Sequence, residues 1–221
     1  MMNEVIWIPV KLSLQIASFS LLVVLILGVL IARLMANRTF KGKSIVDTLL
    51  LLPLVLPPSV VGFLLIVIFG KNSYVGQSIE WLFNQPIIFT WWAAVIAAIV
   101  VAFPLMYQSV LIGFESIDKD IEDASRIDGA SEWNVFLRIT VPLASKAIIT
   151  GGVLSFARAL GEFGATLMFA GNIPGKTQTI PTAIYFAMDS GNMGLAWTLV
   201  IIILAISFLM LISINLIKKL Y

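Results

Sequence analysis

The chain has 221 residues, of which 60% are hydrophobic and 12% are charged, and its net charge is +2. Soluble domains are usually about 45–50% apolar and about 25% charged, so the composition predicts an all-α, polytopic protein embedded in membrane lipid. The sequence contains neither Cys nor His, which excludes disulfides, thiolate chemistry and imidazole metal sites. We expect no metal and no cofactor, and the small net charge gives no indication of nucleic acid as a partner.

Five apolar stretches are long enough to cross a bilayer, because about 20 helical residues cover roughly 30 Å of hydrocarbon. They are predicted at residues 6–36, 45–69, 87–113, 147–170 and 194–217, as about five spans of one transmembrane domain over residues 1–221. A signal peptide is the rival interpretation of the first stretch. No basic residues open the chain and no small-residue cleavage pattern follows the stretch, so we predict a retained helix.

The second stretch is interrupted by Pro53, Pro57 and Pro58. Each proline removes a backbone donor and crowds the carbonyl four residues earlier, so the helix is expected to kink or break. In lipid such a break persists only where protein or a water-filled cavity covers the freed carbonyls. Two interpretations stay open: a kink that serves packing, or a bend that lines a pathway.

Two longer polar loops are predicted at residues 71–86 and 171–193, on the same side of the membrane. Within the second loop, residues 180–188 form an apolar run that is too short to span. We expect a small helix there that dips back toward the membrane.

Basic residues are distributed unevenly between the two sides that five spans would create. Ten of the 14 Lys and Arg residues fall on one side and three on the other. Because basic residues favour the cytoplasmic side, the N-terminus is predicted outside and the C-terminus in the cytoplasm. The ten residues are Arg33, Arg38, Lys41, Lys43, Lys119, Arg126, Arg138, Lys146, Lys218 and Lys219.

The polar interval at residues 121–143, within a predicted cytoplasmic loop at 114–146, has the pattern of two short helices. Asp118 can cap the first helix, Gly129 can end it in a left-handed turn, and Ser131 can cap the second. Apolar residues on the second helix form one stripe, and Pro142 marks the turn into the fourth stretch. This pattern predicts a cytoplasmic knob that touches a partner, and an ordinary interfacial loop is the alternative. The stripe comprises Trp133, Phe136, Leu137 and Ile139.

The fourth stretch carries two opposite charges, Arg158 and Glu162. Each alone would cost about 2.5–3.5 kcal/mol at mid-bilayer, and residues four apart share a helix face and can pair. Either the pair locks helix packing, or Arg158 faces the path of an anion. Other polar groups deep in the stretch are Thr150, Ser155 and Thr166, which predict a weakly binding conduit.

The polar interval resembles the EAA loop of ABC-type import permeases. It reads Asp123-Ala124-Ser125, three residues, Gly129, nine residues, and Ile139-Thr140-Val141-Pro142. It departs from the family pattern by Asp for Glu, with Glu122 one place earlier, by Ser for Ala and by Val for Leu. The resemblance implies a type I ABC importer permease fold and a loop that couples to a separate ATPase. The implied coupling residues are Glu122, Asp123, Ala124, Ser125, Asp128, Gly129, Ala130, Ile139 and Pro142.

Residues 52–65 and 156–185 resemble the permease subunits of molybdate importers, which have sulfate and tungstate permeases as relatives. The resemblance implies a homodimer that forms the translocation path, two copies of an ATP-binding subunit and an extracytoplasmic oxyanion-binding protein. It also implies a bacterial or archaeal cell membrane. Candidate path residues are Arg158, Glu162, Thr150, Ser155, Thr166, Pro57 and Pro58.

Two other classes of function are alternatives to an ABC importer. A secondary anion transporter would need embedded titratable groups, for which only Arg158, Glu162 and Asp47 are candidates. A membrane enzyme would need a cluster of catalytic groups, and the sequence predicts no catalytic residue. No G-x-x-x-x-G-K-[ST] motif occurs, so ATP hydrolysis is expected to belong to another chain.

Overall fold

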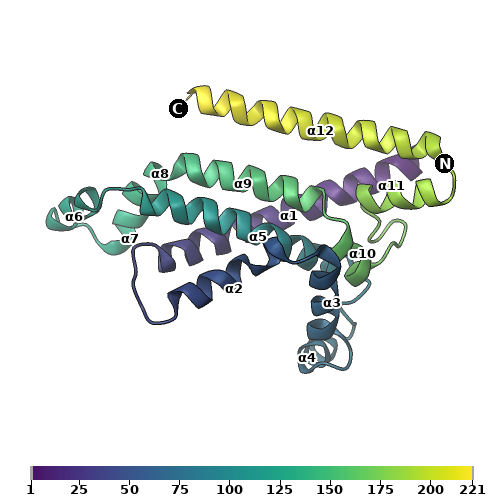
Figure 1. Ribbon diagram of the computed structural model, residues 1–221, viewed down its shortest axis with the longest axis horizontal. Coiled ribbons are helices and arrows are strands. Elements are labelled where there is room, and N and C mark those ends of the chain that lie inside the picture. The colour runs from purple at the N-terminus through teal and green to yellow at the C-terminus, as the bar shows by residue number, and fades with distance from the viewer. Residues whose placement is uncertain (1, 221) are drawn as a thin grey trace.

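The computed structural model describes residues 2–220, with the side chains of residues 4–212, and its described elements are all helices. The all-α expectation is therefore confirmed. Four long helices run roughly along one axis in Figure 1: α1 (Met2–Met35), α5 (Trp91–Glu115), α9 (Ser145–Leu160) and α12 (Met193–Leu220). The side chains of Lys218 and Lys219, which entered the charge count, lie outside the described ones.

Three helices are long and apolar enough to cross a membrane unaided, at Glu4–Met35, Trp91–Glu115 and Met193–Ile212. The number rises to five if two bent helix pairs each count as one span. The described chain thus has between three and five candidate spans, in agreement with a polytopic membrane protein.

The core lies where α1, α5 and α9 pack together. Five of the thirteen buried residues of α5 are alanines, all in its first half, and such small side chains let helices approach closely. Gly113 and Gly151 continue this close packing, because a β-carbon at either would fall within 3 Å of Ala147 or Ser109. In contrast, α12 lies on the outside: 11% of its apolar window is buried, against 50% for α5.

The second apolar stretch is two helices, α2 (Lys43–Val55) and α3 (Pro58–Phe69), which meet at 115°. Leu56 and Pro57 each precede a proline and are extended, with ψ of 140° and 138°, because a following proline disfavours the helical conformation. Pro58 then begins α3, a position where its missing N–H costs nothing. The expected break is present, and Pro53 lies inside α2 without ending it.

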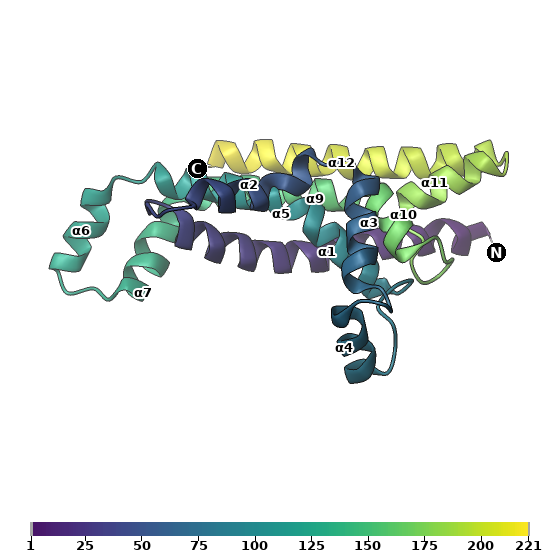
Figure 2. The same ribbon diagram turned by 60° about the horizontal axis from the view of Figure 1, so that its bottom comes forward.

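Helix α3 points away from the bundle axis and leads into α4 (Tyr74–Phe83), as Figure 2 shows. Residues 71–86 were expected to be a polar loop, yet most of them are helical. Ser73 begins α4 because its hydroxyl accepts a hydrogen bond from the Gly76 N–H at 2.9 Å.

The fourth apolar stretch, residues 147–170, was expected to form one helix, but it forms two. Helix α9 ends at Leu160, and a second helix, α10 (Gly164–Ala170), follows after a short break. The expected small helix is present as α11 (Ile180–Asp189).

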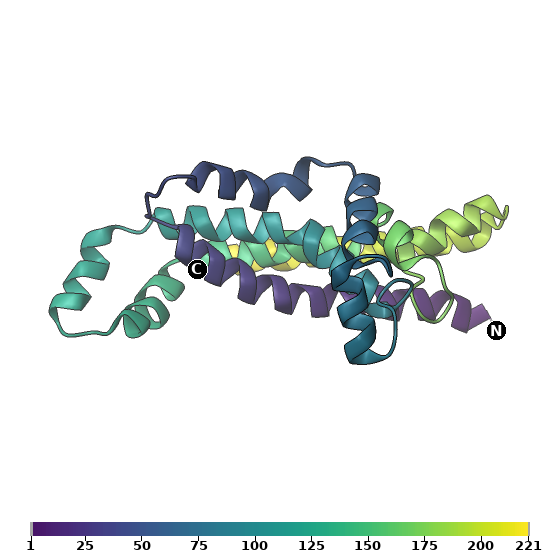
Figure 3. The same ribbon diagram turned by 90° about the horizontal axis from the view of Figure 1, so that it is seen from below.

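The polar interval forms α6 (Lys119–Ile127), α7 (Glu132–Val135), a π-helical turn η1 (Phe136–Thr140) and α8 (Val141–Leu143). Residues 132–143 meet α9 at 71°. Figure 3 shows α6 and α7 at one end of the bundle and the N-terminus at the other. The fold therefore separates the polar interval from the segments around α10 and α11.

Candidate coupling site

Helix α6 begins and ends at the residues that the sequence indicated. The Asp118 carboxylate accepts a hydrogen bond from the Asp120 N–H at 3.0 Å. At the other end Gly129 is left-handed, with φ of +89°, a conformation that costs a side-chain-bearing residue about 1–2 kcal/mol. The Ser131 hydroxyl then accepts from the Asn134 N–H at 3.4 Å and begins α7.

Glu122 is the centre of the polar contacts in this loop. One carboxylate oxygen, Oε1, accepts from Thr140 Oγ1 at 2.5 Å and from Arg33 Nη1 at 3.1 Å, while Oε2 accepts from Arg126 Nη2 at 3.2 Å. Burial disfavours the charged form, but these donors outweigh that effect and hold the pKa of Glu122 below its usual value. The ionised side chain thereby joins α1, α6 and η1.

Arg126 links α6 to α7 across the Gly129 turn. Its Nε and Nη2 donate to the two oxygens of Glu132 at 2.6 and 3.2 Å, a bidentate pairing. Its Nη1 donates to Asp123 Oδ1 at 2.5 Å. The hydrogen bonds that Arg126 donates to Glu132 are the largest effect that raises the pKa of Arg126, so the guanidinium keeps its charge.

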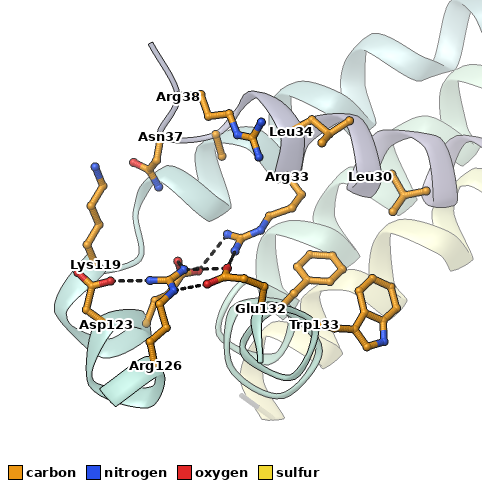
Figure 4. Close-up of a pocket in the computed structure, with 13 residues that line it drawn as sticks. Leu30, Arg33, Leu34, Asn37, Arg38, Lys119, Asp123, Arg126, Glu132 and Trp133 are labelled. Carbon is orange, nitrogen blue, oxygen red and sulfur yellow. Dashed lines mark hydrogen bonds and ion pairs between the residues drawn. The ribbon is translucent and has the colours of Figure 1, made fainter. Parts of the chain in front are cut away.

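A cleft of about 770 Å³ lies between the end of α1 and the α6–α7 unit (Figure 4). The Arg33 guanidinium lies 5.6 Å above the Phe136 ring, a distance at which a cation is attracted to the ring face. The lining residues are Leu30, Arg33, Leu34, Ala36, Asn37, Arg38, Lys119, Glu122, Asp123, Arg126, Glu132, Trp133 and Phe136.

The two candidate acids of the EAA-like pattern have different surroundings. The side chain of Glu122 is 12% exposed and contacts the interior, whereas that of Asp123 is 62% exposed. Asp123 therefore faces solvent apart from its contact with Arg126, and Glu122 holds the loop together.

The remaining predicted coupling residues are spread over the surface of the same unit. Ala124, Asp128, Gly129 and Pro142 are exposed, and Ser125, Ala130 and Ile139 are partly buried. Of the predicted apolar stripe on the second helix, Phe136 is buried and Ile139 is partly buried, while Trp133 and Leu137 are exposed.

Sequence reasoning missed Arg33, Arg126, Glu132 and Thr140 as members of this site. The pairing of Glu122 with Arg126 had a signal, since residues four apart face each other on a helix. Arg33 is 89 positions from Glu122 and had none.

The second predicted pair lies at the break between α9 and α10. Arg158 Nη1 is 2.6 Å from Glu162 Oε2, and Glu162 Oε1 accepts from the Ala165 N–H at 2.7 Å. The Glu162 side chain is 2% exposed and that of Arg158 is 29% exposed. Glu162 thus satisfies a backbone donor that the start of α10 would otherwise leave free.

The other candidate path residues lie in different settings. Ser155 is buried and donates to the Ala102 carbonyl at 3.1 Å, which links α9 to α5. Thr166 is buried in α10, and Thr150 is partly exposed in α9. Pro57 and Pro58 are exposed at the α2–α3 break, and Pro58 lies against Gly164 at the start of α10.

The candidate membrane spans and the polar loop at one end together define a polytopic membrane protein. A family profile described as "Binding-protein-dependent transport system inner membrane component" matches residues 24–220. The chain belongs to this family.

Several relatives are named as molybdenum transport system permease proteins, with the name given as putative for YvgM. YvgM of Bacillus subtilis is 64% identical over 92% of this chain and 89% of its own length. ModB of Escherichia coli K12 is 44% identical over 94% of this chain and 91% of its own. The sulfate transport permease CysT of the same strain is 33% identical over 86% of this chain and 68% of its own.

Solved structures show the same fold. A bacterial ABC transporter that imports alginate has a TM-score of 0.77 at 18% identity, over 98% of this chain and 79% of that chain. The MetNI methionine ABC transporter has a TM-score of 0.76 at 15% identity, over 99% of this chain and 96% of that chain. The expected type I importer permease fold is therefore confirmed.

Proposed function

We propose that this chain is the membrane-spanning subunit of an ATP-driven molybdate importer. The observation that carries the proposal is the 64% identity to a molybdenum permease over 92% of the chain. Identity to the sulfate permease is about half as great, at 33%. Molybdate is therefore favoured over sulfate as the transported oxyanion.

The α6–α7 unit is the element that engages the ATPase. Arg126 of α6 and Glu132 of α7 hold the two short helices together, so a push on one helix moves both. Asp123 and Gly129 remain exposed on the surface, and Ile127 is 86% exposed at the tip of the unit. These exposed side chains are the ones that an ATPase subunit would contact.

The working assembly contains two copies of this chain, two ATPase subunits and an external binding protein. ATP binding draws the two α6–α7 units together, and the spans rock from inward-open to outward-open. The binding protein docks near residues 71–86 and 171–193 and releases the anion, and hydrolysis resets the assembly. The N-terminus lies outside and the C-terminus in the cytoplasm of a bacterial or archaeal cell.

The path between the two copies holds its anion weakly. Arg158 is already paired with Glu162 at 2.6 Å, and Ser155 is committed to the Ala102 carbonyl. A tight site for a divalent oxyanion would use several free donors. Weak binding lets the anion leave, and selectivity then comes largely from the binding protein.

Reconstituted transport tests the proposal. The chain, its ATPase and its binding protein are placed in liposomes, and molybdate uptake is measured with tungstate or sulfate as competitor. We expect ATP-dependent uptake that excess sulfate does not suppress. Strong competition by sulfate would reassign the substrate, and uptake by the chain alone would point to a secondary transporter.

A further inference from the structure

Arg33 connects the first helix to the candidate coupling loop. It lies in the last turn of α1, where a positive charge is favoured by the helix dipole. Its Nη1 donates to Glu122 at 3.1 Å, and its Nη2 lies 3.8 Å from Glu132. The guanidinium also lies over the Phe136 ring, and Figure 4 shows Arg33 pointing from α1 into the cleft toward Glu132.

The loop reaches the bundle by two kinds of connection. Its backbone continues directly from α5 on one side and into α9 on the other. Helix α1 is remote in sequence, and Arg33 gives it a charge-assisted contact with the loop. Since Ala17, Val24 and Ala32 bury α1 in the core, a displacement of its end is passed to the rest of the bundle.

We infer that Arg33 is a positioning residue that transmits movement of the α6–α7 unit to α1. The inference rests on the proposed function, because it presumes that an ATPase moves this unit. Glu122 is the receiving group: Arg126 and Thr140 fix its carboxylate within the loop, so the loop and the Arg33 contact move together. The Arg33 contact therefore connects the loop to α1, in addition to α5 and α9, which the backbone already connects to it.

The test uses the reconstituted complex with Arg33→Met and Arg33→Lys. Lys keeps the charge but loses the planar fork that donates to two carboxylates. Couplings between sites are typically about 5–150-fold, so we expect Arg33→Met to lower molybdate transported per ATP by about fivefold or more. Arg33→Lys should fall in between, and ATPase binding should persist in both variants.

A matched control and a double substitution locate the effect. Arg38→Met removes a second arginine that lines the same cleft and should leave the transport ratio unchanged. Glu122→Gln should lower the ratio, and adding Arg33→Met should lower it no further, since residues in direct contact give non-additive effects.

Three results would overturn the inference. A normal transport ratio in Arg33→Met would show that α1 needs no such contact. Loss of ATPase binding in both Arg33 variants would mean that the residue only keeps the loop folded. An equal loss of molybdate transported per ATP in Arg33→Met and Arg38→Met would indicate a general effect of charge. Failure of the unaltered chain to bind an ATPase would instead contradict the proposed function.

Discussion

Gly164 lies directly against Pro58, so that a β-carbon on the glycine would be 2.8 Å from the proline Cβ. This contact joins the break between α9 and α10 to the break between α2 and α3. Nearby, a β-carbon at Gly62 would be 2.8 Å from Met168 Cβ. The two interrupted stretches therefore pack against each other through glycines, although Pro57 and Pro58 themselves remain exposed within this chain.

Adding volume at this contact should destabilise the fold. We expect Gly164→Val to lower the free energy of unfolding by about 1–3 kcal/mol, the usual cost of overpacking. Thermal denaturation in detergent would measure the effect. Gly152→Ala is the control, because the nearest atom to its β-carbon would be 3.8 Å away. Equal stability of the Gly164→Val and unaltered chains would contradict the packing described.

Removing Arg158 alone should lower the free energy of unfolding more than changing Arg158 and Glu162 together. Arg158→Met leaves a carboxylate that is 2% exposed without its cation. Breaking a fully buried pair costs about 3–5 kcal/mol, and the cost is smaller here because Arg158 is partly exposed. The double variant Arg158→Met/Glu162→Gln keeps an acceptor for the Ala165 N–H and should recover much of the loss.

Uptake by the same double variant separates the two roles considered for the pair. Normal ATP-dependent molybdate uptake would eliminate Arg158 from the anion path and leave it a structural role. Reduced uptake with recovered thermal stability would favour a role in the path.

Gly129→Val should detach the ATPase without unfolding the bundle. The residue has φ of +89° and no atom within 4 Å of a built β-carbon, so the penalty comes from the backbone, at about 1–2 kcal/mol, and not from a clash. Co-purification with the ATPase would measure the loss. Gly191→Val carries the same kind of strain, with φ of +74° and open space, in a segment beside α11. ATPase binding that survives the first change would refute the coupling role of this turn.

The α6–α7 unit should lose stability in acid through Glu122. Its pKa in the folded chain is below the ordinary value of 4.5, so the ionised form is the one that folding favours. The stabilisation is complete above the unfolded pKa and is lost as the pH falls through the folded pKa. The thermal unfolding temperature, measured over that acidic range, should fall less steeply with decreasing pH for Glu122→Gln than for the unaltered chain. Identical pH profiles would show that Glu122 does not carry this dependence.

Local signals allowed much of the candidate coupling site to be predicted. Asp118, Gly129 and Ser131 act at helix ends as expected, because capping depends on neighbouring backbone groups only. The prolines likewise predicted the break after α2. The same reasoning did not find the break after Leu160, since Gly161 and Gly164 are compatible with either helix or turn.

Composition and local spacing determined that this is an all-helical membrane protein, where its apolar stretches lie and where its polar loop begins and ends. Hydrophobicity and capping act over a few residues, so the sequence records them directly. The tertiary structure alone decided that Glu122 faces inward and Asp123 outward, that Arg33 reaches the loop across 89 positions, and that the two broken stretches meet at Pro58 and Gly164. These relationships depend on how the helices pack, and contacts between residues distant in the chain leave no periodic pattern in the sequence.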